Sequence, residues 1–402
     1  MTDAAPPAGA VLSIDLAAIG RNWQRLQRQV APAVCAGVAK ANGYGLGLEA
    51  VGDALWRAGC RVFFVAQSSE GVRLRAALPD ATIAVLNGLM AGEESMMLEH
   101  RLMPVLNDAG QVDRWSRTAR AQEALLPAIL HVDTGMARLG LAAADMAQLA
   151  DSPDRFAGIR LAWVMSHLVI AEEPDHPLNR QQRDAFVRAR QHLPAAAASL
   201  ANSPGIFLGR PYHFDMARPG VALYGVNPQP GRPNPMEQVV GIKARILQLR
   251  EIDRGQTVGY GATFSAARPS RIATLAAGYA DGFPRSLSGH SVVHIAGRVA
   301  PVAGRVSMDL ITVDVSGLPA DSVVPGGWAN LTGPEHDLDA LAADAGTIAY
   351  ELLVGLGQRF ERRYTAALPH TAPPHPVPAD CAFADGTSAD GAGPADDAGQ
   401  SG

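Results

Sequence analysis

Eight short apolar runs recur along the first half of the chain, and a longer segment separates each run from the next. Several of these longer segments, such as residues 48–58 and 181–193, place apolar side chains at helical spacing. Strands that alternate with helices form parallel sheets, and eight such units are typical of a closed barrel. We therefore predict an α/β fold whose first domain, residues 11–227, is a (β/α)8 TIM-type barrel. The eight runs are residues 34–39, 62–66, 82–86, 102–106, 129–132, 161–165, 198–201 and 214–216.

A proline-rich stretch at residues 228–235 interrupts this pattern. Such a stretch continues neither a helix nor a central strand, so we predict a linker there. The runs beyond it are rich in residues that favour strands, which predicts a mostly-β C-terminal domain at residues 236–368. We expect a flexible N-terminus at residues 1–10 and a disordered tail at residues 369–402, where Pro, Ala, Gly, Asp and Ser dominate. The β-rich runs are residues 241–251, 270–276, 290–302 and 310–315.

The composition narrows the classes of function. With 48% hydrophobic residues among 402, the chain is long enough for two domains with substantial cores. The net charge of −5 comes without a basic stripe, so we expect neither nucleic acid nor a membrane surface as a partner. No stretch approaches membrane-spanning length, and the N-terminus lacks the features of a signal peptide. Cys35, Cys60 and Cys381 have unrelated spacings, which predicts no metal site and fits a reducing, cytoplasmic location.

Lys40 ends the first apolar run and is followed at once by a glycine-rich segment that contains Tyr44. A lysine at the end of a buried strand is partly desolvated, which lowers its pKa toward the neutral amine that attacks an aldehyde. The ordinary alternative is a lysine whose head group reaches solvent from a strand end. A second alternative is a dinucleotide site with Glu70 as the ribose-binding acid, but that pattern needs the strand to run directly into the first glycine.

Two turns, residues 201–205 and 217–221, follow the seventh and eighth runs. In (β/α)8 barrels these loops commonly bind phosphate, because their backbone N–H groups point at one place. Either turn alone has an ordinary structural explanation. A reactive lysine on the first strand opposite a phosphate cradle on the last two strands instead suggests pyridoxal phosphate as the cofactor.

Six separated motifs, in sequence order, resemble those of bacterial alanine racemases. They are VAKANGYG at 38–45, VDTGMARLG at 132–140, ANS at 201–203, VGYG at 258–261, AGYADG at 277–282 and GRVSMD at 304–309. The resemblance covers about residues 12–364 and leaves out the tail. It implies a pyridoxal-phosphate-dependent racemase that works as a head-to-tail homodimer. Its substrate would be alanine, interconverted between the L and D forms for peptidoglycan synthesis or for alanine catabolism.

The resemblance assigns two bases to the reaction. Racemisation removes the α-proton from one face of a planar carbanion and returns it on the other, which one fixed base does poorly. Lys40 would serve one face and Tyr260 the other. A tyrosine has an ordinary pKa near ~10 and needs hydrogen-bonding or cationic neighbours, among which the family suggests His167. Arg218 would face the pyridine nitrogen and, because a guanidinium does not give up its proton, would leave that nitrogen neutral.

The remaining site residues also follow from the resemblance. Arg138 would bind the substrate carboxylate and Met308 would add a backbone contact, while Tyr279 and Asp309 would line a narrow entrance. Because the residues after position 235 belong to the second domain, half of each site would come from the other chain of the dimer. Those that would bind the cofactor, besides Lys40, are Tyr44, His167, Asn202, Ser203, Arg218, Gly220, Val221 and Tyr350.

Two positions depart from the family, and three alternatives stay open. His131 stands where many members carry a lysine whose carbamate positions the arginine, so the support of Arg138 is an open question. Ser199 stands where some members have a histidine, which would shorten the contacts behind Arg218. The alternatives are a broader racemase that accepts serine, a non-catalytic pyridoxal-phosphate-binding protein, and a barrel-type decarboxylase or zinc-dependent lyase. The large second domain argues against the binding protein, and the lack of a late His-x-Cys pair argues against the lyase.

Overall fold

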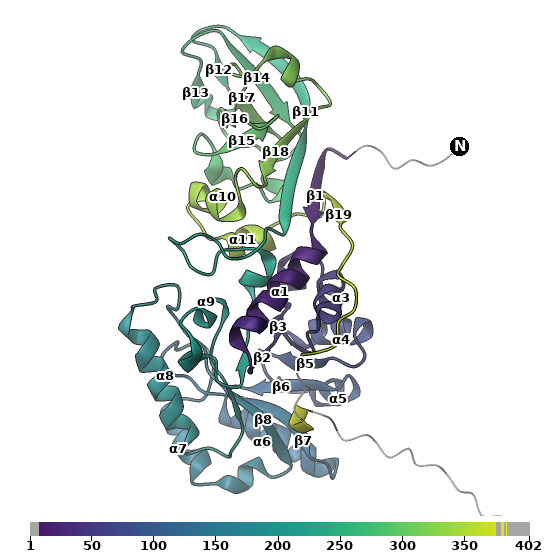
Figure 1. The fold of residues 1–402 in the computed structure, drawn as a ribbon, viewed down its shortest axis with the longest axis vertical. Coiled ribbons are helices and arrows are strands. Elements are labelled where there is room, and N and C mark those ends of the chain that lie inside the picture. Colours follow the sequence, from purple (N-terminus) through teal and green to yellow (C-terminus); the bar gives the residue numbers. More distant parts are fainter. Residues whose placement is uncertain (1–7, 375–378, 382, 384–402) are drawn as a thin grey trace, which may run out of the picture.

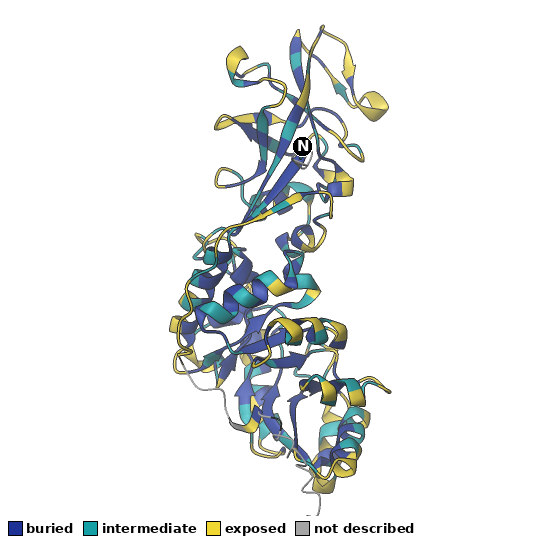
Figure 2. Ribbon diagram, turned by 90° about the vertical axis from the view of Figure 1, so that its right-hand side faces the viewer, coloured by how far each residue is buried: buried dark blue, intermediate teal, exposed yellow. Residues whose placement is uncertain are grey.

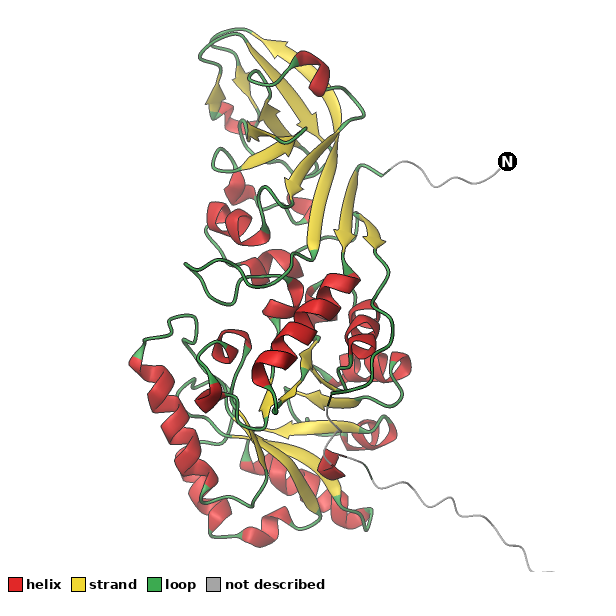
Figure 3. Ribbon diagram, viewed as in Figure 1, coloured by secondary structure: helices red, strands yellow, loops and turns green. Residues whose placement is uncertain are grey.

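The structure of the chain, a computed structural model, describes residues 8–374, 379–381 and 383. Figure 1 shows two parts that follow one another along the long axis of the molecule. One part holds the parallel strands and most of the helices, whereas the other consists mainly of strands (Figure 3). The predicted order, an α/β barrel followed by a mostly-β domain, is confirmed.

The first part is a barrel whose strands all run parallel. β2 and β3 are two pieces of one strand, interrupted at Ala36, so the nine labelled strands occupy eight positions. β2 pairs with β10 and β3 pairs with β4, which closes the wall of the barrel. All eight predicted runs overlap with strands of this barrel. In spatial order the strands are β2 (Val34–Cys35), β10 (Met216–Ala217), β9 (Ala197–Ser199), β8 (Ile159–Met165), β7 (Leu126–His131), β6 (Leu102–Leu106), β5 (Thr82–Val85), β4 (Val62–Val65) and β3 (Gly37–Val38).

The barrel strands are apolar on both faces because they lie between the interior of the barrel and the surrounding helices. Every residue of β4, β6 and β7 is buried. In Figure 2 these buried strands are flanked by helices whose outer surfaces are exposed. This arrangement explains why each strand appears in the sequence as a continuous apolar run rather than as an alternating pattern.

Helices cover the outside of the barrel (Figure 3). In α1 the side chains of Trp23, Leu26 and Val30 are buried at helical spacing, and Asp15 caps the start by accepting a hydrogen bond from the Ala18 amide at 2.9 Å. Among the described residues, no helix is long and apolar enough to cross a membrane. The helices and short 3-10 turns are α1 (Leu16–Val30), α3 (Leu48–Ala58), α4 (Ser68–Ala77), α5 (Glu94–Glu99), α6 (Ala109–Ala121), α7 (Ala143–Ala150), η1 (Pro153–Phe156), α8 (Pro177–Arg190), α9 (Ser203–Ile206), η2 (Arg210–Tyr212) and η3 (Val221–Tyr224).

The second part is organised around the long strand β11 (Val240–Ile252), which follows residues 228–235, a stretch without helix or strand. β11 pairs with β1, β14 and β18. The hairpin of β12 and β13 lies at the end of this domain that is farthest from the barrel (Figure 1). The elements are β12 (Thr257–Val258), η4 (Tyr260–Ala262), β13 (Phe264–Ser265), β14 (Ser270–Leu275), η5 (Tyr279–Asp281), η6 (Arg285–Leu287), β15 (Val292–Ile295), β16 (Arg298–Pro301), β17 (Ile311–Asp314), η7 (Ala320–Ser322), β18 (Trp328–Thr332), α10 (Leu338–Ala345), α11 (Ala349–Val354) and β19 (Glu361–Tyr364).

The N-terminal strand β1 (Ala10–Ile14) belongs to the second domain and not to the barrel. It pairs antiparallel with β11 and parallel with β19, from opposite ends of the sequence. The expected barrel boundary at residue 11 is therefore wrong for this strand, and Ala10 lies in a strand rather than in a flexible terminus. A five-residue apolar strand carries no local signal of its partner, because pairing with β11 joins residues more than 200 positions apart.

Part of the expected disordered tail lies against the barrel. The backbone amide and hydroxyl of Thr371 donate hydrogen bonds to the Arg57 carbonyl at 2.8 and 3.0 Å. The short turn η8 (Ala379–Cys381) lies beside β7 and β8, where the Asp380 carbonyl accepts a hydrogen bond from Arg160 at 3.0 Å and Cys381 is buried. The expectation of disorder is thus wrong for residues 369–374 and 379–381, and most of the remaining tail lies outside the described residues.

Candidate active site

Lys40 lies two residues after the end of β3, at the carboxyl-end rim where (β/α)8 barrels place their chemistry. It begins the short turn α2 (Lys40–Tyr44), in which Ala41, Asn42 and Gly43 have φ angles of 54°, 55° and 64°. In this left-handed region an L-residue loses about 1–2 kcal/mol relative to the right-handed helical conformation. Backbone strain of this kind is typical of functional sites, where the surrounding structure holds it in place.

The strained turn is held by Glu70, which lies in the first turn of α4. One carboxylate oxygen accepts a hydrogen bond from the Asn42 amide at 3.0 Å, and the other accepts one from the Ala66 amide at 2.9 Å. Arg73 donates to the Asn42 side chain at 3.1 Å. Glu70 therefore supports the Lys40 turn instead of reaching a ribose, which removes the basis of the dinucleotide-site alternative. Its only sequence signal is the capping pattern that Gln67 and Glu70 form at the start of α4.

The surroundings of Lys40 favour its neutral amine. Burial lowers the pKa of Lys40 most, and the positive charge of Arg138 lowers it further, while Glu70 opposes both. A lysine whose pKa moves toward neutrality is a better nucleophile and a better base at physiological pH than an exposed one. This direction agrees with the desolvated lysine that the end of the first apolar run predicts.

Three tyrosines form an aromatic cluster next to this turn. Tyr44 stacks on Tyr224 with ring centroids 4.4 Å apart, and the Tyr350 ring of α11 lies 6.3 Å from Tyr44. Tyr224 donates a hydrogen bond to the Val38 carbonyl at 3.0 Å and so ties η3 to β3. Tyr44 is only 6% exposed, yet its hydroxyl has no hydrogen-bond partner among the described residues. Sequence analysis missed Tyr224, since a tyrosine in a 3-10 turn has no distinctive pattern.

The two turns after β9 and β10 meet in front of Tyr44. The Ser203 hydroxyl accepts hydrogen bonds from the amides of Gly220 at 2.9 Å and Ala222 at 3.3 Å. A Cβ at Gly220 would lie 2.2 Å from the Tyr44 hydroxyl, so only glycine fits there. η3 begins at Val221, so the first N–H groups of this turn have no carbonyl partner within it. The Ser203 hydrogen and the Val221 amide, which donate to no described residue, are left as donors for an anion.

Arg218 lies just after β10 and is 4% exposed. It donates one hydrogen bond to the Ser199 hydroxyl and another to the Ser166 carbonyl at 2.5 Å. Ser199 in turn donates to the Met216 carbonyl at 2.7 Å, so it contacts Arg218 directly and the contacts behind the arginine are short. Burial lowers the pKa of Arg218 to about 10, which leaves it protonated at neutral pH. Towards a ligand, Arg218 is therefore a donor and not an acceptor.

His131 is fixed in one tautomer by Asn107. The Asn107 amide nitrogen donates to the carbonyls of Leu86 at 3.0 Å and Val105 at 2.9 Å, so its oxygen accepts from His131 Nδ1 at 2.8 Å. His131 Nε2 is thereby left as an acceptor. Burial, followed by the positive charge of Arg218, lowers the pKa of His131 to about 4. The ring is therefore neutral at physiological pH.

His167 and Asn202 lie on neighbouring loops of the same rim. The carbonyl of His167 accepts a hydrogen bond from the Gln182 side chain at 2.9 Å, which fixes the loop after β8. Burial and then the charge of Arg218 lower the pKa of His167, so its ring is neutral too. Asn202 caps α9 by accepting a hydrogen bond from the Gly205 amide at 3.0 Å.

Arg138 lies on a loop that Asp133 organises. A carboxylate oxygen of Asp133 accepts hydrogen bonds from the amides of Gly135 and Met136, both at 2.9 Å. The exposed Arg138 side chain itself makes no hydrogen bond or ion pair with any described residue, although its charge acts on Lys40. Asp133 therefore fixes the backbone of this loop, while the Arg138 guanidinium is available to bind a ligand.

The structure brings Tyr350 of the second domain to the Lys40 turn of the same chain, beside Tyr44, but it does not bring Tyr260 there. Tyr260 is 75% exposed and lies in η4, within the β12–β13 hairpin. That hairpin is at the end of the second domain farthest from the barrel (Figure 1). Tyr279 and Met308 are exposed as well. The loops that carry them adjoin the hairpin, since a Cβ at Gly259 would lie 3.3 Å from the Arg305 amide.

Comparisons with known proteins agree with this geometry. The alanine racemase N-terminal domain family matches residues 14–228, and the alanine racemase C-terminal domain family matches residues 239–364. The alanine racemase of Rhodospirillum rubrum is 50% identical over 359 residues, which span 89% of this chain and 96% of that protein. A Mesorhizobium japonicum protein, named as a catabolic alanine racemase, is 49% identical over 360 residues, 89% of this chain and 93% of its own.

A solved structure gives the same result for the fold. The crystal structure of alanine racemase from Bartonella henselae, with covalently bound pyridoxal phosphate, matches with a TM-score of 0.87 and 41% identity. The match covers 89% of this chain and 100% of that one. Both domains and their order are thus shared, and this chain belongs to the alanine racemase family and is an amino-acid racemase.

Proposed function

We propose that this chain interconverts L-alanine and D-alanine with pyridoxal phosphate as its cofactor. The observation that carries the proposal is a partly desolvated lysine on the barrel rim, next to a buried tyrosine whose hydroxyl has no partner among the described residues. The proposal is supported by the names of the relatives, and the Bartonella henselae protein holds pyridoxal phosphate covalently.

The groups around Lys40 fit a cofactor with an aldehyde and a phosphate. Tyr44 is buried, its hydroxyl has no hydrogen-bond partner among the described residues, and a Cβ at Gly220 would fill the space beside it. We assign the phosphate to Tyr44, Tyr350, Ser203 and the backbone of Gly220 and Val221. The ring would then lie near Asn202, His167 and Arg218. Bound there, pyridoxal phosphate would supply an electron sink that makes the α-hydrogen of an amino acid acidic.

Lys40 and Tyr260 are assigned as the two bases. Burial lowers the pKa of Lys40, which favours the neutral amine that can take up a proton. Tyr260 would take or return the proton on the opposite face. This tyrosine would belong to the partner chain. Arg218 donates hydrogen bonds but no proton, which disfavours protonation of a ring nitrogen beside it. Such an arrangement favours prompt return of the proton to carbon over side reactions.

Arg138 is assigned to the substrate carboxylate, with a backbone contact from Met308 of the other domain. The His131 ring is neutral and has an acceptor at Nε2, so it can hold a guanidinium by a hydrogen bond. We propose that this acceptor takes the positioning role that a lysine carbamate has in many relatives. It would hold Arg138 without adding a negative charge close to the substrate carboxylate.

A homodimer with shared sites is also proposed. Tyr260, Tyr279, Met308 and Leu310 expose much of their apolar surface on neighbouring loops. Exposed patches of this kind mark interaction sites. Because Tyr260 is remote from Lys40 within one chain, the domain of a second chain would complete the site, with Tyr279 and Asp309 at its entrance.

The physiological role has two candidates. A relative named as catabolic favours breakdown of alanine, whereas supply of D-alanine for peptidoglycan is the other. Deletion of the gene distinguishes the catabolic role from the biosynthetic one. Only loss of a biosynthetic enzyme produces a strain that requires D-alanine for growth.

Chiral analysis of products tests the activity itself. The purified protein with added pyridoxal phosphate is incubated with L-alanine, L-serine and larger L-amino acids, and Lys40→Ala is the control. We expect D-alanine as the main product and none from the control. A faster conversion of serine would establish the broader racemase instead, and no D-amino acid from any substrate would contradict the proposal.

A further inference from the structure

Two loops that carry the proposed entrance residues are locked to each other in the second domain. The Tyr279 amide donates to the Ser307 carbonyl and the Ala280 amide donates to the Met308 carbonyl, both at 3.0 Å. A Cβ at Gly278 would lie 2.4 Å from both of these carbonyl oxygens. The turn η5 and the loop at residues 304–309 therefore form one unit.

The Arg359 guanidinium joins the two loops through their carboxylates. Its Nε and Nη2 donate to the two oxygens of Asp281, each at 2.8 Å, and its Nη1 donates to Asp309 at 2.6 Å. Asp281 is 4% exposed and also accepts a hydrogen bond from the Gly278 amide at 2.9 Å. The planar fork of the guanidinium thus binds Asp281 with two donors and Asp309 with a third. Such a bidentate contact fixes the relative position of the groups as well as pairing their charges.

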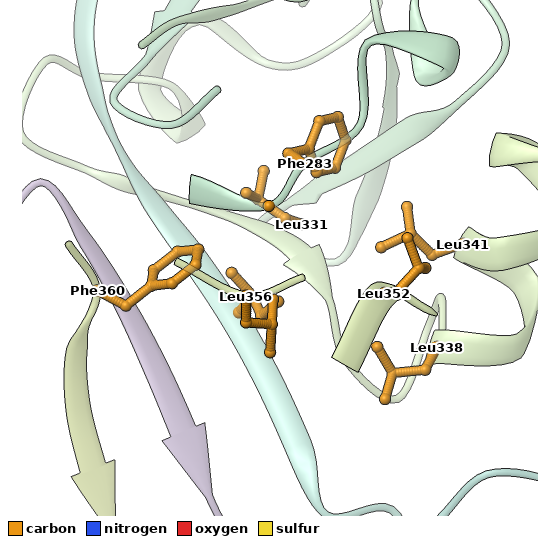
Figure 4. A pocket seen from close by; sticks show the side chains of 9 residues that line it. Phe283, Leu331, Leu338, Leu341, Leu352, Leu356 and Phe360 are labelled. Atoms are coloured by element: carbon orange, nitrogen blue, oxygen red, sulfur yellow. The ribbon is translucent and has the colours of Figure 1, made fainter. Parts of the chain in front are cut away.

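The segment that carries Arg359 is itself anchored in the core. Leu356 and Phe360 lie on either side of it in the sequence and pack in one apolar cluster with Phe283 and Leu331 (Figure 4). The space left among these side chains is about 10 Å³, barely the size of one water molecule. The Gly357 amide donates to the Asp281 carbonyl at 3.0 Å. The backbone of Arg359 is therefore held from both sides, and its fork has a defined place.

We propose that Arg359 is a positioning residue that holds Tyr279 and Asp309 in place at the entrance of the partner chain's active site. This inference rests on the proposed shared site. It assigns Arg359 two effects. The fork keeps the two loops in register, and it neutralises Asp309, whose free carboxylate would repel the carboxylate of an arriving amino acid. Loss of the fork should therefore weaken substrate capture more than the proton transfers.

Hydrogen exchange tests the positioning directly and needs no activity. Arg359→Gln should increase deuterium uptake in peptides that cover residues 278–282 and 304–309, with and without cofactor, and leave the barrel peptides unchanged. Arg363→Gln is the matched control, because Arg363 is as exposed as Arg359 and also pairs with a carboxylate, Glu361, at 2.6 Å. Unchanged uptake in both loops would overturn the proposal.

Heterodimers test on which site Arg359 acts. Lys40→Ala and Tyr260→Phe chains, each inactive alone, should form one intact site that uses Lys40 of one chain and Tyr260 of the other. Arg359→Gln on the Lys40→Ala chain should raise KM about tenfold and change kcat less than about twofold. The same change on the Tyr260→Phe chain should leave KM unaltered. Equal effects of the two placements, or none, would overturn the proposal.

The two measurements also separate this inference from the proposed function. If heterodimers without the arginine change are inactive after verified subunit exchange, the shared site fails, and positioning at a partner's entrance fails with it. If the heterodimers are active but the exchange of the two loops is unaltered in Arg359→Gln, only the role of Arg359 fails. Arg359→Lys, which keeps the charge but not the fork, should show the same local increase in exchange if Arg359→Gln does not fold.

Discussion

The contact between Gly220 and Tyr44 gives a prediction with an internal check. In Gly220→Ala the new methyl group would lie 2.2 Å from the Tyr44 hydroxyl, where ordinary contacts begin at 3.4 Å. The ring has little room to retreat, because it stacks on Tyr224 with centroids 4.4 Å apart. Overpacking of this kind costs about 1–3 kcal/mol, so we expect Gly220→Ala to lose that much unfolding free energy in urea.

The double variant Gly220→Ala/Tyr44→Phe tests the physical cause. Without the hydroxyl, the nearest atom of the ring is 3.1 Å from the methyl group, which a small shift relieves. The double variant should therefore be about 1–2 kcal/mol more stable than the sum of the single losses predicts. It should still bind pyridoxal phosphate weakly, because the proposed phosphate donor is gone. Gly317→Ala is the control, since a Cβ there meets nothing within 4 Å. Simple additivity of the two losses would refute the proposed clash and the cradle built on it.

Three further predictions follow from the site, its support and the tail. Tyr260→Phe should abolish net racemisation but still let Lys40 exchange the α-hydrogen of D-alanine in deuterated water; equal exchange into both enantiomers would contradict the two-base assignment. The pKa of His131 is about 4 in the folded chain and 6.5 in the unfolded chain. The contribution of the neutral ring to the free energy of unfolding is therefore complete above pH 6.5. It falls toward pH 4, because there the unfolded chain binds a proton that the folded chain does not. Over that range the wild type should lose up to about 3 kcal/mol more than His131→Gln in urea unfolding, and parallel pH profiles would count against a buried neutral ring. Truncation after residue 368 removes the hydrogen bonds of Thr371 and the burial of Cys381. The free energy of unfolding should fall by roughly 1–3 kcal/mol, which lowers the melting temperature by a few degrees. An unchanged melting temperature would show that these contacts contribute nothing to stability.

Local patterns were enough for the barrel. A parallel strand buried on both faces is a continuous apolar run, so each barrel strand could be recognised in the sequence. The end of the first run then placed Lys40 on the rim of the barrel. The turns at Ser203 and Gly220 could be read in the same way, from glycine and proline at the ends of the last two strands.

Long-range contacts account for what the sequence did not reveal. β1 pairs with β11 and β19, and no local pattern in five apolar residues distinguishes those partners from barrel strands. Arg359 meets Asp281 from 78 positions away, in a chain with many exposed arginines. The position of Tyr260 relative to Lys40 is a further case. Its role came only from the family motif, and within a single chain the β12–β13 hairpin that carries Tyr260 lies far from the barrel (Figure 1).

Chemical trapping of the cofactor lysine tests the central claim most directly. The chain has only two lysines, Lys40 on the barrel rim and Lys243 on β11, where the Lys243 ammonium lies 4.8 Å from the centre of the Trp328 ring. The protein is loaded with pyridoxal phosphate, reduced with borohydride, digested and mapped by mass spectrometry. The account predicts a pyridoxyl group on Lys40 in the wild type and in Lys243→Arg, and none in Lys40→Arg. A label on Lys243, or no label on Lys40 in a protein that racemises alanine, would contradict it.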